Sequence, residues 1–384
     1  MRMAMGLAIA VIAGGALAWA AGFPPLTVPA GLGVNIHFTG APARDLDMIQ
    51  AAGFKFIRMD FAWSAVEREK GVYDFRAYDE LTEALAKRGI RALYILDYGN
   101  SLYESEQSVR TEDGRQAFAR FAAAAAARYR GRGILWELWN EPNISFWKPQ
   151  PNVDDYMALA KVVFPAIRHA DPKALCVAPA TSGIPMDFLE SCFRQGLLRL
   201  VDGVTVHPYR GKPPETVADD IMRLRALMAR YGRTLPVLSG EWGYSSVWKG
   251  QDEQLQGQYL ARQFLTNLSL GIPVSIWYDW HDDGPDPKES EHHFGTVTLD
   301  YNPKPAYLAM KRLVGELKGE RFVKRLQSAT DDYLLLFSDR SRRTIAAWTV
   351  GKAHEVEPVR GLKVALSGDP QYLPVPAGAR LASR

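Results

Sequence analysis

Two glutamates end short apolar stretches of the chain, one hundred residues apart. Glu141 follows a run rich in tryptophan and leucine and precedes Pro142, which has no N–H and disfavours helix at the residue before it. Glu241 follows a second apolar run and lies between Gly240 and Trp242. A carboxyl group at the end of a buried strand is poorly solvated, so it keeps its proton to a higher pH, as a general acid requires. Two such groups on two strand ends are what hydrolysis of a glycosidic bond needs.

This chemistry gives each carboxyl group a different role. We expect Glu141 to act first as the general acid and then as the base, and Glu241 to act as the nucleophile. The nucleophile must stay ionised, and Arg58 and Tyr209 have side chains that would stabilise its charge. Asn140 has an amide that would donate to a sugar 2-hydroxyl group. A separation of about 5–5.5 Å between the carboxyl groups would give retention of anomeric configuration.

Other residues at predicted strand ends are of types that line or support sugar sites. Tryptophan rings offer flat apolar faces to sugars, but tryptophan is also often mostly buried, so we expect only one of Trp277 and Trp280 to face the ligand, with Trp277 favoured. For the histidines, packing inside the protein is the alternative role. These further candidates are His37, Trp63, Asp97, His207, Trp277 and Trp280.

Apolar stretches alternate with amphipathic ones along most of the chain. The predicted strands are 32–38, 54–59, 91–97, 134–139, 174–179, 202–207, 235–240 and 273–279. The predicted helices are 43–52, 75–88, 113–130, 153–170, 185–199, 214–231, 252–270 and 303–317. This alternation predicts an α/β fold, a (β/α)8 or TIM barrel, with its chemistry at the carboxyl ends of the strands. An open doubly wound sheet would also alternate, but the sequence has no glycine-rich phosphate loop after an early strand.

The pattern changes near residue 319. Short runs of strand type follow, separated by Asp, Ser, Gly and Arg, and they predict a small antiparallel β domain. These runs are 322–326, 333–337, 343–349, 354–359 and 362–365. We therefore divide the chain into a catalytic barrel at 30–318 and a small β domain at 319–384.

The beginning of the chain has the pattern of a secretory signal. Met1 and Arg2 precede an apolar run that reaches Phe23, and the segment 18–20 is a small-x-small site. We predict a signal peptide over 1–20 and hence a secreted or periplasmic protein. An uncleaved membrane anchor is the alternative, because about 20 apolar residues can just span a bilayer. In an exported chain, Cys176 and Cys192 are either two separate core thiols or a disulfide.

Composition limits the classes of partner. The 384 residues are 47% hydrophobic and 23% charged, as in a globular protein with a large core. The formal net charge of +3 is small and no block of lysine and arginine is present, so nothing indicates nucleic acid. The segment 281–293 is rich in Asp, Glu and His, but its spacing fits no zinc or calcium motif. We expect this segment to be a loop over the site, and we expect neither a metal nor an organic cofactor.

Several motifs resemble those of the clan A glycoside hydrolases. These motifs are Trp139–Pro142, Arg58, His207 with Tyr209, and the Glu241 strand end. The resemblance covers roughly residues 32–316 and implies a retaining (β/α)8 enzyme, with the acid/base after strand four and the nucleophile after strand seven. Within the clan, the stretches 57–67 with 71–75, 276–284 and 292–296 resemble family 39 and its bacterial exopolysaccharide endoglycosidases. That resemblance implies a β-linked glycan and a C-terminal β-sandwich. Family 5 is the nearest alternative, but its members usually carry histidine at the third strand end, where this chain has Asp97 and Tyr98.

The residues and the resemblance lead to one hypothesis and two rivals. The hypothesis is an exported retaining glycosidase that cleaves β-linkages within a polysaccharide or oligosaccharide chain. The first rival is an exo-acting, β-xylosidase-like hydrolase. The second is a barrel that binds glycans without turnover, because a fold does not guarantee activity.

Overall fold

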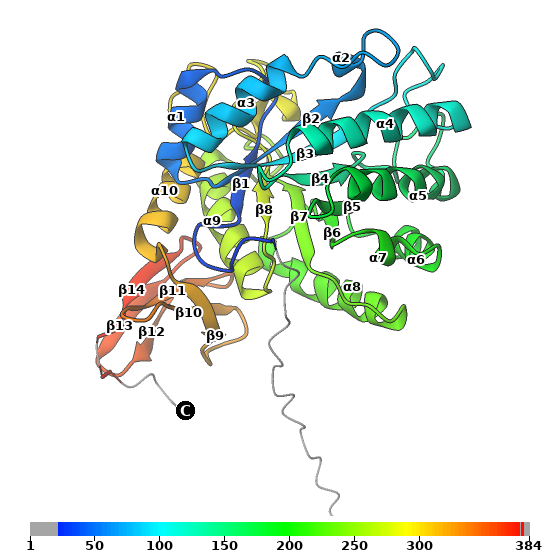
Figure 1. Ribbon diagram of the computed structural model, residues 1–384. Coiled ribbons are helices and arrows are strands. Elements are labelled where there is room, and N and C mark those ends of the chain that lie inside the picture. Colours follow the sequence, from blue (N-terminus) through cyan, green and yellow to red (C-terminus); the bar gives the residue numbers. More distant parts are fainter. Residues whose placement is uncertain (1–21, 377, 380–384) are drawn as a thin grey trace, which may run out of the picture.

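The computed structural model describes residues 22–376, 378 and 379. Eight parallel strands close into a barrel in sequence order, which confirms the predicted TIM barrel (Figure 1). The strands are β1 (Leu32–Asn35), β2 (Phe56–Ala62), β3 (Arg91–Asp97), β4 (Leu135–Leu138), β5 (Leu175–Ser182), β6 (Gly203–His207), β7 (Val237–Trp242) and β8 (Ser275–Trp277). The predicted signal peptide, residues 1–20, lies outside the described residues. Within the part of the chain that is described, no helix is both long and apolar enough to cross a membrane.

Helices follow the strands and cover the outside of the barrel (Figure 1). They are α1 (Ala43–Ala52), α2 (Trp63–Val66), α3 (Arg76–Lys87), α4 (Glu112–Arg128), α5 (Val153–Ala170), α6 (Met186–Arg194), α7 (Leu197–Leu200), α8 (Ala218–Arg230), α9 (Glu253–Ser269) and α10 (Pro305–Leu317), with 3₁₀ turns η1 (Pro214–Val217) and η2 (Ser290–His293). The predicted helix 185–199 is in fact two helices. Gly196 separates them with a φ of 96°, a left-handed conformation that favours glycine.

Side-chain caps explain where several of these helices begin. Thr111 accepts a hydrogen bond from the Gly114 N–H at the start of α4, and Asn152 accepts from the Asp154 N–H at the start of α5. Each cap satisfies a backbone donor that has no partner within the helix. The sequence therefore fixes the helix starts locally, and the loops between strand and helix remain free to carry other side chains.

Alternate residues of the strands point into the barrel. Phe56, Ile95, Leu135, Leu238 and Ile276 belong to one buried cluster that is separate from the main core. Such layers of side chains fill the interior of a barrel of eight strands. The residues between them on each strand face the surrounding helices and join the main core.

The tail forms two small sheets, as the predicted β-sandwich-like domain requires. A four-stranded sheet has the order β14 (Gln371–Pro374), β11 (Arg343–Thr349), β10 (Asp332–Ser338) and β9 (Arg321–Arg325), and a hairpin joins β12 (His354–Val359) to β13 (Leu362–Leu366). Strand β14 was not among the predicted runs. Leu334 and Leu336 pack with the hairpin in a separate core, whereas Leu335 and Phe337, on the opposite face, join the main core. The tail therefore packs on the barrel with one sheet face, while the boundary at residue 319 stays a prediction.

A buried ion pair within the barrel also accepts a hydrogen bond from the tail. Glu215 in η1 is 4% exposed, and its carboxylate accepts hydrogen bonds from Arg262 Nε and Nη2 at 2.6 and 2.8 Å. The same carboxylate accepts from Trp348 Nε1, in β11, at 2.7 Å. Three segments that lie far apart in the sequence therefore converge on one carboxylate.

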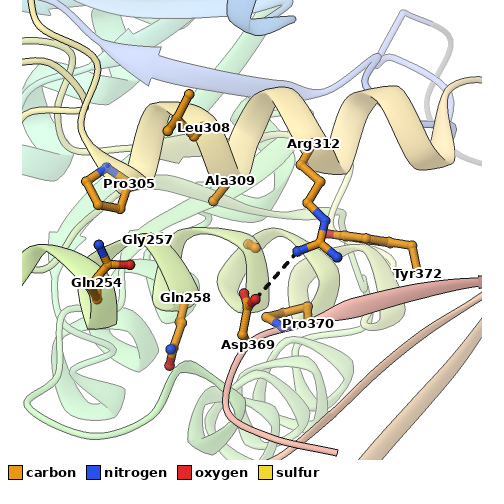
Figure 2. A pocket seen from close by; sticks show the side chains of 11 residues that line it. Gln254, Gly257, Gln258, Pro305, Leu308, Ala309, Arg312, Asp369, Pro370 and Tyr372 are labelled. Atoms are coloured by element: carbon orange, nitrogen blue, oxygen red, sulfur yellow. Dashed lines mark hydrogen bonds and ion pairs between the residues drawn. The ribbon is translucent and has the colours of Figure 1, made fainter. Parts of the chain in front are cut away.

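A shallow cavity of about 280 Å³ lies next to this junction, between α9, α10 and the tail. Figure 2 shows Gln254 and Gln258 on one side of it, with Arg312, Asp369 and Tyr372 on the other. Arg312 and Asp369 form an ion pair at 3.5 Å, and both side chains are about half exposed. This cavity lies on the outer surface of the barrel, so it is separate from the strand ends.

The two cysteines are buried as free thiols. Cys176 lies in β5 and Cys192 in α6, and burial raises the pKa of the Cys176 thiol to about 12. Of the two alternatives that the sequence left open, the structure shows separate core thiols.

The junction yields a prediction about stability. Glu215→Ala removes one partner of a buried ion pair and leaves Arg262 and Trp348 unpaired, so we expect the free energy of unfolding to fall by about 3–5 kcal/mol. Urea unfolding followed by tryptophan fluorescence measures the change. Glu316→Ala, at an exposed position of α10, is the matched control and should change the value by less than about 0.5 kcal/mol. Equal stability of the two variants would show that this carboxylate does not hold the tail to the barrel.

Candidate active site

The carboxyl ends of the barrel strands surround a cavity of about 590 Å³. Six predicted site residues line this cavity: His37, Arg58, Asn140, Glu141, Tyr209 and Glu241. They come from the ends of β1, β2, β4, β6 and β7 or from the residues just after them. Closure of the barrel therefore gathers side chains that are spread over two hundred residues of sequence.

Glu241 lies in β7 with its side chain 13% exposed. Its Oε1 accepts a hydrogen bond from the Tyr209 hydroxyl at 2.8 Å, and its Oε2 accepts from Arg58 Nη1 at 2.5 Å. Each oxygen thus has a donor, one of them cationic, and both contacts favour the ionised carboxylate. These are the two residues that the sequence assigned to this carboxylate.

Arg58 connects the nucleophile candidate to three further side chains. It is 1% exposed, and its Nε donates to Glu137 Oε1 at 2.8 Å. Its Nη2 donates to Asn140 Oδ1 at 2.8 Å, and its Nη1 approaches Asn35 Oδ1 at 3.3 Å. Burial would lower the pKa of Arg58, but the charges of Glu137 and Glu241 outweigh burial and raise it. The guanidinium is therefore a fixed positive charge with acceptors from β1, β4 and β7.

Glu137 is a part of the site that the sequence did not reveal. It lies in β4 with no exposed surface, and its Oε2 has no hydrogen-bond partner among the described residues. A Cβ at Gly240, on β7 across the barrel, would lie 3.1 Å from this oxygen, so glycine there leaves room for the carboxylate. A glutamate inside an otherwise apolar strand, four residues before Glu141, is the signal that could have found it.

Glu141 lies in a tight turn after β4. The strand ends at Leu138, earlier than predicted, and Glu141 has a φ of 47° with its N–H donating to Ala180 O at 2.9 Å. Burial raises the pKa of the Glu141 carboxyl to about 7, against the opposing effects of the Arg58 charge and a hydrogen bond to Ser182. The carboxyl therefore holds its proton to near neutral pH, as an acid catalyst requires.

His207 is the neighbour of Glu141 on β6. Its Nδ1 lies 3.0 Å from Glu141 Oε1, and the ring is fully buried. Burial lowers the pKa of His207 to about 4, although the charge of Glu241 opposes this effect. The imidazole is therefore neutral at pH 7, and it orients Glu141 without adding a positive charge that would drive the proton off.

The two carboxyl groups lie close together. One oxygen of Glu141, one of Glu241 and a ring nitrogen of His207 all lie within 4.8 Å of one another. Carboxyl groups about 5–5.5 Å apart suit a retaining mechanism, whereas inverting enzymes need about 6.5–9.5 Å to admit a water molecule between them. The observed spacing agrees with the retaining arrangement.

The three predicted tryptophans do not line the cavity. Trp63, Trp277 and Trp280 are at most 1% exposed, so the expectation that Trp63 and one of Trp277 and Trp280 offer a face to a sugar ring is wrong. Trp277 follows the inward residue Ile276 on β8, and strand alternation therefore turns its ring outward into the main core. Trp63 donates through Nε1 to Glu67, and Trp280 donates through Nε1 to Asp45. All three rings are structural.

Asp97 was also misplaced as a cavity residue. It ends β3 with no exposed surface, behind Asp60, and it does not line the cavity. Burial raises the pKa of Asp97 well above its usual range, and the charge of Asp60 raises it further. Asp97 is therefore a buried acid outside the cavity rather than a contact for a ligand.

His37 lies at the rim of the cavity with its side chain 47% exposed. Its Nε2 is 3.3 Å from Oδ2 of Asp279, which is 1% exposed. Burial would lower the pKa of His37, but the hydrogen bond and charge of Asp279 outweigh burial and raise it to about 9. The ring is therefore cationic at neutral pH and is held by a buried acid.

The aromatic walls of the cavity come from loops that the sequence did not reveal. Phe146 follows β4, is 38% exposed and stacks on Tyr98 with ring centroids 6.1 Å apart. On the other side, Trp248 lies 5.3 Å from Phe294, and Phe294 lies 5.2 Å from Tyr278. These rings, rather than the strand-end tryptophans, offer apolar surface to a sugar.

Among the residues that the structure describes, two groups of side chains have donor types that could hold a metal ion. They are Glu141 with His207 and Glu241, and His37 with Asp279 and Asp283. In the first group, Arg58 already donates to Glu241. In the segment 281–293, Asp282 binds Lys304 and the Gly295 N–H, while His293 lies 2.8 Å from Asp286 O. The loop side chains thus mainly stabilise the loop itself.

Comparison with known families and proteins gives consistent matches. Residues 31–284 match the family model for cellulase (glycosyl hydrolase family 5). A β-xylosidase from Geobacillus stearothermophilus is 30% identical over 206 residues, a match that spans 46% of this chain and 40% of that protein. The chain therefore matches less than half of this relative's length.

Solved structures show the same fold over most of the chain. A family 39 glycoside hydrolase from Bacteroides cellulosilyticus is 26% identical with a TM-score of 0.79, and the match covers 92% of this chain and 81% of that one. A family 39 β-xylosidase from Caulobacter crescentus is 22% identical with a TM-score of 0.67, and the match covers 89% of this chain and 82% of that one. The first of these matches supports the resemblance to family 39. The second shows only that the two chains share a fold.

The raised pKa of Glu141 can be measured directly. We expect its carboxyl group to titrate with a midpoint near pH 7, because burial disfavours the charged form. Carbon-13 NMR of protein labelled at the glutamate carboxyls follows the titration, and Glu141→Gln identifies the signal by removing it. The protonated fraction should fall as the pH rises through 7. A midpoint near 4.5 would show that the cavity solvates this carboxyl like a free one.

Proposed function

The chain belongs to the cellulase family (glycosyl hydrolase family 5) and is a glycoside hydrolase, and from this premise we propose that it is a retaining β-glycosidase. The observation that carries the proposal is the carboxyl pair, Glu141 and Glu241, with oxygens within 4.8 Å of one another. Their environments differ as the mechanism requires. Glu141 keeps its proton, while Glu241 accepts from a buried guanidinium and a phenol.

The first step forms a covalent intermediate. Glu241 attacks the anomeric carbon, and the bond from that carbon to the leaving oxygen breaks while Glu141 gives the oxygen its proton. In the second step, Glu141 is ionised and takes a proton from a water molecule that attacks the same carbon, which frees Glu241. Two inversions at one carbon retain its configuration. Asn140, whose Oδ1 accepts a hydrogen bond from Arg58, is proposed to donate through its amide nitrogen to the sugar 2-hydroxyl group.

For the substrate, we propose a β-linked glycan chain that is cleaved internally. This choice rests on the stretches that resemble exopolysaccharide endoglycosidases, 57–67 with 71–75, 276–284 and 292–296. The second candidate is exo-acting, β-xylosidase-like cleavage, which the match to the Geobacillus stearothermophilus β-xylosidase favours. Internal cleavage lowers the viscosity of a polymer early, whereas cleavage from the end releases monosaccharide with little change in viscosity. Both readouts taken on one digest separate the candidates.

We also propose that the enzyme is exported. The apolar run after Arg2 and the small-x-small site at 18–20 support this proposal. Sequencing the N-terminus of the protein recovered from its native host tests it: a start at Ala21 agrees with cleavage, and a start at Met1 contradicts it.

Substitution of the two carboxyl groups tests the mechanism. We expect Glu241→Gln to reduce reducing-end release from the best glycan of a β-glycan panel by several powers of ten, because no covalent intermediate forms. Glu141→Gln should reduce the rate of reducing-end release from that glycan by as much. It should slow the first turnover of an aryl β-glycoside far less, because the leaving group of that substrate needs no proton. The anomer formed first, seen by proton NMR, should be the β-anomer.

Distinct outcomes contradict distinct parts of this proposal. Full activity in either variant would show that the catalytic pair is misassigned. A first-formed α-anomer would replace the retaining mechanism with an inverting one. A wild-type protein that binds a glycan by calorimetry but releases no reducing ends would support the binding-protein alternative.

Glu137 is expected to position the nucleophile through Arg58. Glu137→Gln removes the negative charge that accepts from Arg58 Nε, so the guanidinium would be positioned less firmly. We expect kcat to fall about 10- to 100-fold, because small displacements of reacting groups slow a reaction by that much. KM should change little, because Glu137 does not line the cavity. The matched control is Glu215→Gln, the same change in a buried Glu–Arg pair outside the site, which should lower stability but leave kcat near the wild-type value. Equal kcat values for the two variants would remove the positioning role of Glu137.

A further inference from the structure

The carboxylates of the cavity outnumber the cations that could neutralise them. Asp60, Glu241 and Glu291 line it together with Glu141, which holds its proton to near neutral pH, against the cations Arg58 and His37. Arg58 is already shared between Glu137 and Glu241. His37 is held by Asp279, and Asp283 belongs to the same group. Both cations are therefore already paired with acids of the protein and would attract an acidic ligand only weakly.

Two carboxylates, Asp60 and Glu291, have no cation of the described residues in direct contact, although the charge of Asp60 raises the pKa values of both Arg58 and His37. Neither takes part in an ion pair with another described residue, although Arg58, His37 and the other acids around the cavity do. Glu291 Oε2 accepts only a long hydrogen bond, 3.4 Å from the Tyr278 hydroxyl. Asp60 is half-buried and lies near Asp97, a fully buried acid whose pKa is raised above its usual range by burial. Glu291 is exposed to the cavity, and a cationic group on a ligand would be attracted to both carboxylates.

Aromatic rings surround the Glu291 side of the cavity. Tyr278, which contacts Glu291, packs edge-on against Phe294, and Phe294 packs edge-on against Trp248. All three rings line the cavity with Glu291. Faces of aromatic rings attract cations as well as the apolar faces of sugars. A carboxylate among such rings is a recognition site for an ammonium group carried on a sugar ring.

We propose that this cavity selects its glycan by charge: Asp60 and Glu291 favour an amino sugar with a free, protonated amine and reject a sugar that carries a carboxylate. This inference rests on the proposed glycosidase function and names the substrate class of that same site. The discrimination has two parts, since opposite charges attract the amine and like charges repel a uronic acid. Neutral sugars fall between the two.

A series of matched glycosides tests the inference. The probes are the 4-nitrophenyl β-glycosides of glucosamine, glucose and glucuronic acid, with charges of +1, 0 and −1. Affinity by calorimetry and kcat/KM should fall in that order, by about tenfold at each step, and the steps should shrink in 1 M salt. The N-acetylglucosamine glycoside keeps the nitrogen without its charge, so it should behave like the neutral member.

Variants assign the effect to the two carboxylates. Asp60→Asn and Glu291→Gln should each reduce the ratio of glucosaminide to glucuronide affinity by about tenfold, because each removes one facing charge. Glu316→Gln removes an exposed acid on α10 that does not line the cavity, and should leave the ratio unchanged.

The outcomes separate this inference from the proposed function. If the glycosides bind equally, if the N-acetylated compound binds as well as the free amine, or if both variants keep the wild-type ratio, selection by charge is wrong. Cleavage that still depends on Glu141 and Glu241 would then leave the glycosidase proposal intact. If the affinity order holds while no glycan is cleaved, the charge selection stands and the glycosidase proposal fails.

Discussion

The arrangement of the site depends on one guanidinium buried inside the barrel. Removing a charged group from water costs several kcal/mol, and this cost is offset only when nearby acceptors satisfy its donors. Arg58 meets that condition with acceptors on β1, β4 and β7, namely Asn35, Glu137, Asn140 and Glu241. These strands meet only when the barrel closes. Closure and site assembly are therefore one event, because the charge that makes Glu241 a nucleophile is stabilised only in the closed barrel.

The second constraint is that two neighbouring carboxyl groups must hold opposite protonation states. Glu241 receives two donors, whereas Glu141 faces a neutral imidazole and a low-dielectric wall, so that burial dominates and raises its pKa to about 7. His207 is central to this difference. A cationic histidine at 3.0 Å would favour the ionised form of Glu141, but burial lowers the pKa of His207 to about 4 and keeps it neutral. The same neighbouring charge, Arg58, serves the nucleophile at 2.5 Å and acts on the acid only from a distance.

The sequence allowed the barrel, the carboxyl pair and the partners of Glu241 to be predicted for a physical reason. Hydrophobic periodicity identifies strands, and in a parallel barrel the carboxyl end of every strand lies at the same face, so residue types at those ends suffice. The prediction failed where orientation mattered. Trp277 and Asp97 are at strand ends, but strand alternation turns the first outward, and the second lies beneath Asp60. Phe146 and Trp248 were missed because loops have no periodicity from which the direction of a side chain could be inferred.

The charge of the whole chain gives no guide to the charge of its site. The formal net charge is +3, yet the cavity is lined by four carboxyl groups and two cations, and both cations are already paired with acids. Salt screens exposed charges beyond about 10 Å but screens buried groups much less, so the small net charge of the chain says little about the field inside the cavity. The proposed selection by charge therefore depends on the groups that line the cavity and on how each of them is paired, and not on the balance of charges over the whole chain.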